Sequence, residues 1–391
     1  FDDFSENTIS NYYFPYGVAP NFSINDKIYT IPMVIEESSV VAAASKAAKF
    51  WLSRGGFKAK VLSTTKSGQI HFLFKGDKEK LKNFFTVKKV NLISATKSIT
   101  KNMESRGGGI KDISLLDKTN TLENFYQIDV KFETCDAMGA NFINSVLECI
   151  AVALKGQAQE YSSFNNSEKE IEVIMSILSN YTPECIVKTF VECPIKDLGI
   201  ISEMEAHEFA HKFERAVQIA KVDVNRAVTH NKGIFNGIDA VVLATGNDFR
   251  AIEACGHAYA ARDGQYRGLS SCSIENGMFR FELTIPLALG TIGGLTGLHP
   301  MSKMSLELLE QPSASELMKI VSVVGLAQNF GALSSLVTTG IQKGHMKMHL
   351  LNILNQLSAT KEQIEKAKLY FANTTVSFSN VRDFLQAGHL Q

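Results

Sequence analysis

The stretch VVAAASKAAKFWLSRGGFKAKVLSTTKSGQIHFLFK (residues 40–75) changes its periodicity in the middle, and this change decides the fold. The first part, from about Ser38 to Trp51, repeats small and apolar residues with a helical period. The second part has the pattern of two strands, Lys58–Thr64 and Gln69–Lys75, joined by a Lys-Ser-Gly turn. The sequence therefore predicts that a compact unit containing strands begins where a helical region ends.

The segment that follows, roughly 60–175, alternates between helical and strand patterns. Residues 1–35 look irregular. The predicted elements are helices over Asp77–Phe85, Ala140–Leu154, Glu203–His230, Ser313–Leu336, Gln342–Leu357 and Thr360–Phe371, and strands over Asn124–Thr134 and Phe279–Leu287. The predicted fold class is α+β, with a compact α+β unit inserted into a larger and mainly helical domain.

The composition of the 391 residues is that of an ordinary globular protein, with 45% apolar and 20% charged residues. Lys+Arg and Asp+Glu number 40 each, which argues against nucleic acid as the main partner. No apolar run approaches the roughly 18–20 residues that span a bilayer, and the acidic, polar stretch FDDFSENTIS does not resemble a signal peptide. The cysteines are scattered without a CxxC pair, so we expect reduced thiols in a cytoplasmic protein.

The segment HEFAH matches the HExxH pattern of zinc peptidases. In that hypothesis His207 and His211 hold the metal, and Glu208 is the general base. A catalytic zinc also needs a third ligand, which the sequence does not indicate. Because Phe209 and Phe213 begin an apolar stripe and the histidines lie on the opposite side, we favour an ordinary surface helix.

Two glycine-containing turns are candidates for binding a phosphate. The run Arg106–Gly109 is not a dinucleotide-binding fingerprint, because no apolar strand leads directly into it. It is either a flexible turn or a place where backbone amides approach an anion. In the run Cys135–Asn141, Asp136 is well placed to cap the following helix. The small residues there would let a polyphosphate approach the helix N-terminus.

Charged residues next to apolar runs are candidates for catalysis. Lys232 and Asp248 flank IDAVVLA, so either each lies at an exposed helix end or the two pair inside a cleft. The pair Glu36–Glu37 begins an apolar helix, where the dipole favours negative charge and where a half-buried carboxyl could donate a proton. His345 and His349 lie one helical turn apart, and such a pair is more often structural than catalytic.

Taken in order, seven segments resemble the 3-hydroxy-3-methylglutaryl-coenzyme A (HMG-CoA) reductase family in its soluble, bacterial, class II form. They span most of the chain. The segments are ENTIS (6–10), IPMVIEESSVVAAASKAAKFW (31–51), RGGGIKDI (106–113), DAMGAN (136–141), NRAVTHNKGIFNGIDAVVLATGNDFRAIEA (225–254), GLAQNFGAL (325–333) and GIQKGHMKMH (340–349). The membrane-anchored class of the family is less similar.

The resemblance implies a four-electron, reversible reduction that uses NADPH, NADH or both, and no metal. HMG-CoA receives a hydride to give a hemithioacetal, coenzyme A leaves, and the resulting mevaldehyde receives a second hydride to give mevalonate. This is a reaction of the mevalonate pathway of isoprenoid biosynthesis, although class II members also degrade mevalonate, so the direction stays open.

The resemblance also implies four catalytic residues. Lys232 matches the lysine that stabilises negative charge on the carbonyl oxygen. Asp248 matches the aspartate that holds this lysine, so we expect the two to form an ion pair. Glu37 matches the proton-transferring glutamate, and His345 matches the histidine that protonates the leaving thiolate.

The family's binding positions carry over in the same way. The residues that match positions holding the hydroxymethylglutaryl group are Ser39, Arg226, Asn236 and Asn329. The residues that match the nicotinamide-dinucleotide motif are Asp136, Met138, Gly139 and Asn141. Thr100 lies in the stretch Lys97–Lys101, which has no carboxylate where NADH-preferring members carry an acidic residue. We therefore expect that NADPH is preferred or that both cofactors are accepted.

The implied arrangement is a mainly helical substrate-binding domain (1–60 and 176–338), an inserted ferredoxin-like NAD(P) domain (61–175) and a small helical C-terminal flap (339–391). The implied partners are HMG-CoA, mevalonate, coenzyme A and a second copy of the chain, in a homodimer or a set of dimers with shared active sites. No nucleic acid or membrane partner is expected. A non-catalytic acyl-CoA-binding protein on the same scaffold is a further alternative, although binding alone needs no proton donor for a thiolate.

Overall fold

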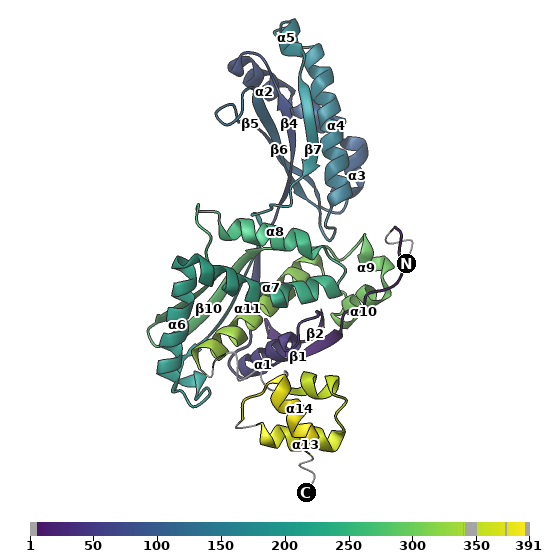
Figure 1. Ribbon diagram of the computed structural model, residues 1–391. Helices are drawn as coiled ribbons and strands as arrows, with labels where there is room; N and C mark the ends of the chain where they lie inside the picture. Colours follow the sequence, from purple (N-terminus) through teal and green to yellow (C-terminus); the bar gives the residue numbers. More distant parts are fainter. Residues whose placement is uncertain (1–5, 339, 341–349, 372–373, 388–391) are drawn as a thin grey trace.

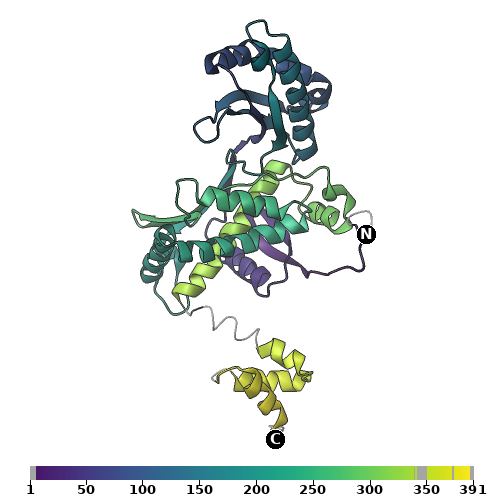
Figure 2. The ribbon, with the colours of Figure 1, turned by 45° about the horizontal axis from the view of Figure 1, so that its top comes forward.

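The computed structural model describes residues 6–338, 340, 350–371 and 374–387. Helices and sheets are mixed in it, and the buried apolar residues form three separate clusters. A smaller module of strands and helices stands on a larger module and is joined to it by a narrow crossing of strands (Figure 1). The last helices form a third group on the other side of the larger module (Figure 2).

A four-stranded antiparallel sheet in the order β5-β6-β4-β7 forms the smaller module. Its elements are β4 (Lys66–Leu73), α2 (Lys78–Ala95), α3 (Lys97–Glu104), β5 (Gly109–Asp117), β6 (Phe125–Glu133), α4 (Ala140–Gln159), α5 (Asn166–Lys169) and β7 (Glu172–Leu178). Helices α2 and α3 contact β5, and α4 contacts β4 and β7. Alternate residues of β6, such as Ile128 and Val130, are fully buried in this core, as expected for a strand with one covered face.

The larger module contains a second antiparallel sheet in the order β3-β8-β10-β9. Its strands are β3 (Lys58–Thr64), β8 (Cys185–Pro194), β9 (Ser270–Glu275) and β10 (Met278–Pro286). Asn276 and Gly277 join β9 to β10 with φ angles of 50° and 75°. This left-handed pair is the backbone of a two-residue hairpin turn, which Asn-Gly favours.

Helices surround this sheet and supply most of the larger core. They are α1 (Val40–Leu52), the 3-10 helix η1 (Ile195–Leu198), α6 (Ala206–Val222), α7 (Val224–Ala244), α8 (Phe249–Ala260), α9 (Leu295–Leu298), α10 (Pro300–Leu308) and α11 (Ala314–Val337). Aromatic rings meet at the centre, where Phe330 of α11 lies 5.2 Å from Trp51 and 5.4 Å from Phe213, measured between ring centroids.

Helix α11 has 24 residues and, among the described helices, is the one long and apolar enough to cross a membrane. The statement that no apolar run approaches that length was therefore wrong. In the structure 67% of its most apolar window is buried, and the helix contacts α1, α7 and β8. Its composition is explained by its place at the centre of the larger core.

The N-terminal region was wrongly predicted to be irregular. Strands β1 (Tyr16–Ile24) and β2 (Lys27–Val34) form an antiparallel hairpin with a shift in register between Ala19 and Phe22. Asn25 and Asp26 make its turn with φ angles of 48° and 71°. The bulge interrupts the alternation of apolar residues, which explains why the pattern was missed.

The predicted single helix over Glu203–His230 is two helices, α6 and α7. Asp223 separates them with an extended backbone, and its carboxylate accepts a hydrogen bond from the backbone N–H of Arg226 at 2.7 Å. An aspartate in this position begins a new helix by satisfying one of its free N–H groups. The apolar period continues across this residue, so periodicity alone did not show the break.

The predicted Lys-Ser-Gly turn was also wrong, because Lys66 to Gly68 lie inside β4. Strands β3 and β4 belong to different sheets, with Thr65 between them, so the chain crosses from one module to the other at this point. Toward the C-terminus, α13 (Lys361–Tyr370) and α14 (Phe378–Gln386) pack with a helical segment at 350–356. The other part of the helix predicted over Gln342–Leu357 lies outside the described residues.

Candidate active site

Helix α7 presents Lys232 and Asn236 on one face, because the two residues are one helical turn apart. The Lys232 side chain is 58% exposed, so its ammonium stands at the surface of the larger module. The following turns of α7 are buried, including Ile238 and Val241. The apolar run next to Lys232 is therefore the inner face of the helix that carries it.

Glu37 lies in the turn between β2 and α1 and meets this face of α7. Its Oε2 accepts hydrogen bonds from Lys232 Nζ, in a close ion pair, and from Asn236 Nδ2 at 3.4 Å. Ser39, two residues later, has a left-handed φ of 77° and is half-buried. The structure thus brings an acid to an ammonium and an amide that lie almost 200 residues away in the sequence.

Asp248 has a different environment from the one expected. It is the N-cap of α8, and its carboxylate accepts the backbone N–H groups of Arg250 at 3.0 Å and Ala251 at 3.2 Å. The Arg250 guanidinium also donates to it at 3.1 and 3.2 Å. Partial burial acts to raise the pKa of Asp248, but the hydrogen bonds from Arg250 and Ala251 outweigh it, and the pKa lies below its ordinary value.

The expected ion pair between Lys232 and Asp248 is not formed within the described chain, so that expectation was wrong. Lys232 is bound to Glu37, and Asp248 is bound to Arg250. Helix α7 continues from Lys232 to Ala244, which at about 1.5 Å per residue is about 18 Å. The two charged groups of one chain are therefore separated by most of a helix.

Two acidic side chains lie close to each other where α7 and α8 pack together. Asp239 of α7 faces Glu253 of α8, and its Oδ1 has no hydrogen-bond partner among the described residues. Burial, followed by the negative charge of Glu253, raises the pKa of Asp239 from 3.8 to about 8. Protonated Asp239 therefore stabilises the fold at low pH, and this stabilisation is lost as the pH rises through about 8.

We expect Asp239→Asn to raise the melting temperature relative to wild type by more at about pH 8 than at about pH 4, because the variant has no buried charge to form and the stability that wild type loses grows between these two values. Thermal unfolding followed by circular dichroism across this range measures the difference. Glu253→Gln is the matched variant and should act in the same direction. A difference from wild type that is equal at both pH values would show that Asp239 does not titrate in this range.

Asn329 belongs to a buried polar chain that runs through Ser270 to His230, one helical turn after Arg226. Asn329 is 1% exposed and accepts a hydrogen bond from Ser270 Oγ at 2.7 Å, and Ser270 Oγ also lies 2.6 Å from His230 Nε2. Burial, followed by the charges of Arg226 and Lys221, lowers the pKa of His230 to about 3. Sequence reasoning missed His230 and Ser270, although His230 lies one helical turn after Arg226.

The loop between β6 and α4 carries the predicted cofactor residues. Gly139 caps α4 with φ 90°, and within the described part of the chain no side-chain hydrogen bond caps this helix start. Met138 and Gly139 are followed by Ala140, and Asn141 is exposed in the first turn. The uncapped helix start fits an anion, because backbone N–H groups and the helix dipole both favour negative charge there.

Asp136 was predicted to cap α4, and this prediction was wrong, because the N-cap is Gly139. Its Oδ1 accepts the backbone N–H of Ala314 at 2.7 Å, so it binds the start of α11 in the larger module. Its carbonyl oxygen accepts the N–H of Thr291 at 2.8 Å. Local sequence favoured the nearest helix, whereas this carboxylate attaches the loop between β6 and α4 to the larger module.

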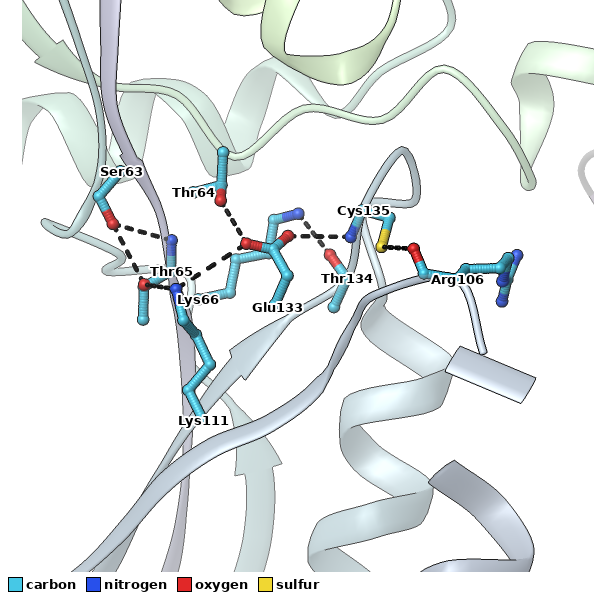
Figure 3. A network of polar contacts seen from close by, with 9 residues as sticks. All are labelled: Ser63, Thr64, Thr65, Lys66, Arg106, Lys111, Glu133, Thr134 and Cys135. Atoms are coloured by element: carbon cyan, nitrogen blue, oxygen red, sulfur yellow. Dashed lines mark hydrogen bonds and ion pairs between the residues drawn. The ribbon is translucent and has the colours of Figure 1, made fainter. Parts of the chain in front are cut away.

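The glycine run beside this loop is a tight turn from α3 into β5. Gly107 and Gly109 have φ angles of 91° and 116°. A Cβ on Gly108 would collide with the Glu133 carbonyl oxygen and with Met103. The Cys135 thiol donates to the Arg106 carbonyl at 3.3 Å, which brings the two loops together (Figure 3).

The residues of the stretch Lys97–Lys101 lie on α3. Thr100 is 1% exposed, so its side chain belongs to the wall of the module and not to an open surface. Lys97 Nζ forms an ion pair with Glu104 at 3.0 Å, and Lys101 is exposed. Both cations of this stretch are exposed, and Lys97 is the one held in an ion pair.

The HEFAH histidines lie on the exposed side of α6, while Phe209 and Phe213 are buried. Glu208 forms an ion pair with Lys212 at 2.7 Å, one turn along the same helix. Within the described residues no three His, Cys, Asp or Glu side chains are grouped as ligands. The zinc-peptidase alternative is not favoured. His345 and His349 lie outside the described residues.

The chain is similar in sequence to the 3-hydroxy-3-methylglutaryl-coenzyme A reductase of Archaeoglobus fulgidus, with 35% identity over 366 residues, 93% of this chain and 80% of the relative. A probable reductase of the same name from Borreliella burgdorferi is 36% identical over 377 residues, covering 94% and 83%. In solved structures, the class II HMG-CoA reductase of Streptococcus pneumoniae bound to NADPH in open conformations matches with a TM-score of 0.78 and 36% identity, covering 86% of this chain and 88% of that one.

These similarities and the site define an oxidoreductase of mixed helix and sheet. The model of the Hydroxymethylglutaryl-coenzyme A reductase family matches residues 1–350. The chain belongs to this family.

Proposed function

We propose that this chain reduces HMG-CoA to mevalonate and free coenzyme A with NADPH or NADH, as a class II enzyme. The observation that carries the proposal is the contact of Glu37 with both Lys232 and Asn236 at the surface of α7. A site that only bound an acyl-CoA would not need an acid in direct contact with an ammonium. This pair can instead handle the charge and the proton that a carbonyl oxygen acquires during reduction.

The chemistry of the pair follows from where charge develops. The dihydronicotinamide of the cofactor, when bound, supplies a hydride to the carbonyl carbon. The carbonyl oxygen gains negative charge in the transition state, and the Lys232 ammonium stabilises that charge more than it stabilises the neutral substrate. Glu37 accepts from the same ammonium, so it can move a proton to or from the oxygen that binds there.

The remaining substrate contacts are proposed from the family positions. Ser39 follows Glu37 in the same turn, and Arg226 begins the helix that carries Lys232. Both can donate to the hydroxymethylglutaryl carboxylate. Asn329 is buried and would act by orienting Ser270, to which it is hydrogen-bonded. His345, outside the described residues, keeps its proposed role as proton donor to the coenzyme A thiolate.

We propose that the smaller module, in the range 61–175, holds the cofactor. Its βαββαβ order supports a ferredoxin-like assignment. The uncapped start of α4 supports a role for Met138, Gly139 and Asn141 in holding the cofactor's anionic groups. The larger module, 1–60 and 176–338, would bind the substrate, and 339–391 would be the C-terminal flap.

The separation of Lys232 from Asp248 supports an active site shared by two copies of the chain. Asn247, next to Asp248, accepts the N–H of Gly290 at 2.9 Å, and a Cβ on Gly290 would collide with the backbone nitrogen of Met138. Asp248 therefore lies on the side of the loop that carries Met138, whereas Lys232 lies about 18 Å away along α7. A homodimer would bring the Lys232–Glu37 pair of one copy to the Asp248 and cofactor loop of the other.

We further propose a cytoplasmic location, which six free cysteines support. A spectrophotometric assay tests the function. NADPH or NADH consumption should depend on HMG-CoA, with two cofactor molecules oxidised for each thiol released. A chelator should leave the rate unchanged. No HMG-CoA-dependent oxidation with either cofactor would contradict the proposal, and loss of activity on chelation would favour metal chemistry.

The same assay tests the cofactor preference. We expect kcat/KM with NADPH to equal or exceed that with NADH, because the exposed Lys101 can attract a 2′-phosphate. Lys101→Gln should lower kcat/KM for NADPH and leave NADH within about twofold, since surface charges act mainly on the charged partner. A wild-type enzyme that strongly favours NADH would contradict this expectation.

A further inference from the structure

Lys66 lies where the chain crosses between the two modules. Strand β3 ends at Thr64 in one sheet, and β4 begins at Lys66 in the other. The chain returns after β7, where the Ser179 N–H donates to the Ser67 carbonyl at 2.9 Å. The two crossing segments are thus hydrogen-bonded to each other, which fixes the position of the Lys66 backbone.

The Lys66 side chain is buried, with 4% exposure. Its ammonium donates to Thr134 Oγ1 at 2.5 Å and to the Ala137 carbonyl at 3.0 Å. No carboxylate of the described residues forms an ion pair with it, and burial lowers its pKa. A buried ammonium without a paired carboxylate is costly to the fold, so its presence calls for a function.

The two groups that Lys66 binds belong to the loop that leads into α4. Thr134 Oγ1 also donates to the Ala137 carbonyl at 2.7 Å, and Cys135 between them has a left-handed φ of 51°. A Cβ on Gly139 would collide with the Thr134 side chain. The path of the loop to the open N–H groups of α4 therefore depends on where Thr134 is held.

A separate set of contacts holds the residue before this loop. Glu133 accepts the Cys135 N–H at 2.9 Å and the Thr64 hydroxyl, and Lys111 lies 4.0 Å from its carboxylate (Figure 3). Lys111 is therefore a neighbouring cation of the same network that does not touch Thr134 or Ala137. It provides a matched control for Lys66.

We propose that Lys66 is a positioning residue for the cofactor: its buried ammonium holds the turn at residues 134–137 so that the open N–H groups of α4 face the anionic part of NAD(P)H. This rests on the proposed function of the smaller module. The ammonium, which forms no ion pair with a carboxylate of the described residues, also adds positive charge behind the helix start and so favours an anion there.

The proposal predicts an effect on cofactor binding without a loss of stability. In Lys66→Met the Thr134 hydroxyl still donates to the Ala137 carbonyl, so both groups that Lys66 binds keep one hydrogen bond. Removing a buried charge then leaves the melting temperature equal to or above that of wild type. The loop loses its charged anchor, and the Kd for NADPH should rise about tenfold or more, since hydrogen bonds to charged groups contribute that much.

The experiment uses the full-length protein and NADPH itself as the probe. NADPH fluorescence titration gives Kd, initial rates give the two KM values, and calorimetry gives the melting temperature. We expect the KM for HMG-CoA to stay within about twofold in Lys66→Met and the Kd for NADPH in Lys66→Arg to stay within about threefold of wild type, because arginine retains the charge and donors. Lys111→Met should bind NADPH as wild type does.

Two results would overturn the inference. In the first, Lys66→Met binds NADPH as tightly as wild type. In the second, the affinity of Lys66→Met for NADPH, its affinity for HMG-CoA and its melting temperature all fall together, as expected for a residue that only stabilises the fold. A wild-type protein that binds NADPH but does not reduce HMG-CoA would contradict the proposed function instead, and the binding comparison would still decide the role of Lys66.

Discussion

Replacing Lys232 with alanine is expected to lower kcat about 1,000-fold, while HMG-CoA binding changes by only a few-fold. The ammonium is 58% exposed, so it adds little to stability. Its expected contribution comes in the transition state, where a carbonyl oxygen becomes negative within reach of the Lys232–Glu37 pair. Steady-state rates and a binding titration with HMG-CoA in the absence of cofactor measure the two quantities separately.

Two further variants make this result specific. Lys212→Ala removes an exposed lysine that also forms an ion pair with a glutamate, in this case Glu208, and should leave kcat unchanged. Glu37→Gln keeps an acceptor for Lys232 but cannot carry a proton, so it should also lose turnover. Persistent turnover in Lys232→Ala would rule out the proposed mechanism.

Mixing two inactive variants is expected to restore activity. Lys232→Ala and Asp248→Asn should each be inactive alone, and asparagine preserves the N-cap of α8. If each active site takes Lys232 from one copy and Asp248 from the other, a mixed dimer contains one intact site. With random pairing, co-expression should then give about a quarter of the wild-type activity per chain.

The control is co-expression of Lys232→Ala with a chain that carries both substitutions, which leaves no intact site in any dimer. It should remain inactive. If the mixture of the two single variants also stays inactive although mixed dimers form, Lys232 and Asp248 act within one chain, and the shared site is wrong. Isolation with two different affinity tags establishes that mixed dimers are present.

Local sequence predicted the strongly periodic elements well. Strand β3 was predicted with the bounds Lys58–Thr64, and α11 and β10 were predicted within a residue of their ends. Periodicity failed where a single residue changes the chain direction. Asp223 divides α6 from α7, and the bulge near Asn21 hides the alternation of β1. In each case the helix cap or the bulge acts over a few residues, which a windowed pattern does not detect.

The candidate site was only partly accessible from the sequence. Lys232 and Asn236 share a helix face because they are one turn apart, and this follows from the sequence alone. The partner of Lys232 does not, since Glu37 approaches from the turn before α1. The burial of the Lys66 ammonium could not be predicted either, because a lysine that begins a strand is usually exposed.

Helix and strand patterns, motifs and the resemblance to a reductase family could all be predicted from the sequence, because they depend on residues that are neighbours along the chain. The ion pairs and hydrogen bonds between charged groups could not. In the folded chain Lys232 forms an ion pair with Glu37, and Asp248 forms one with Arg250. The Asp136 carboxylate accepts a hydrogen bond from the start of α11. Such contacts depend on how whole helices and sheets pack, and packing joins groups that no local spacing relates.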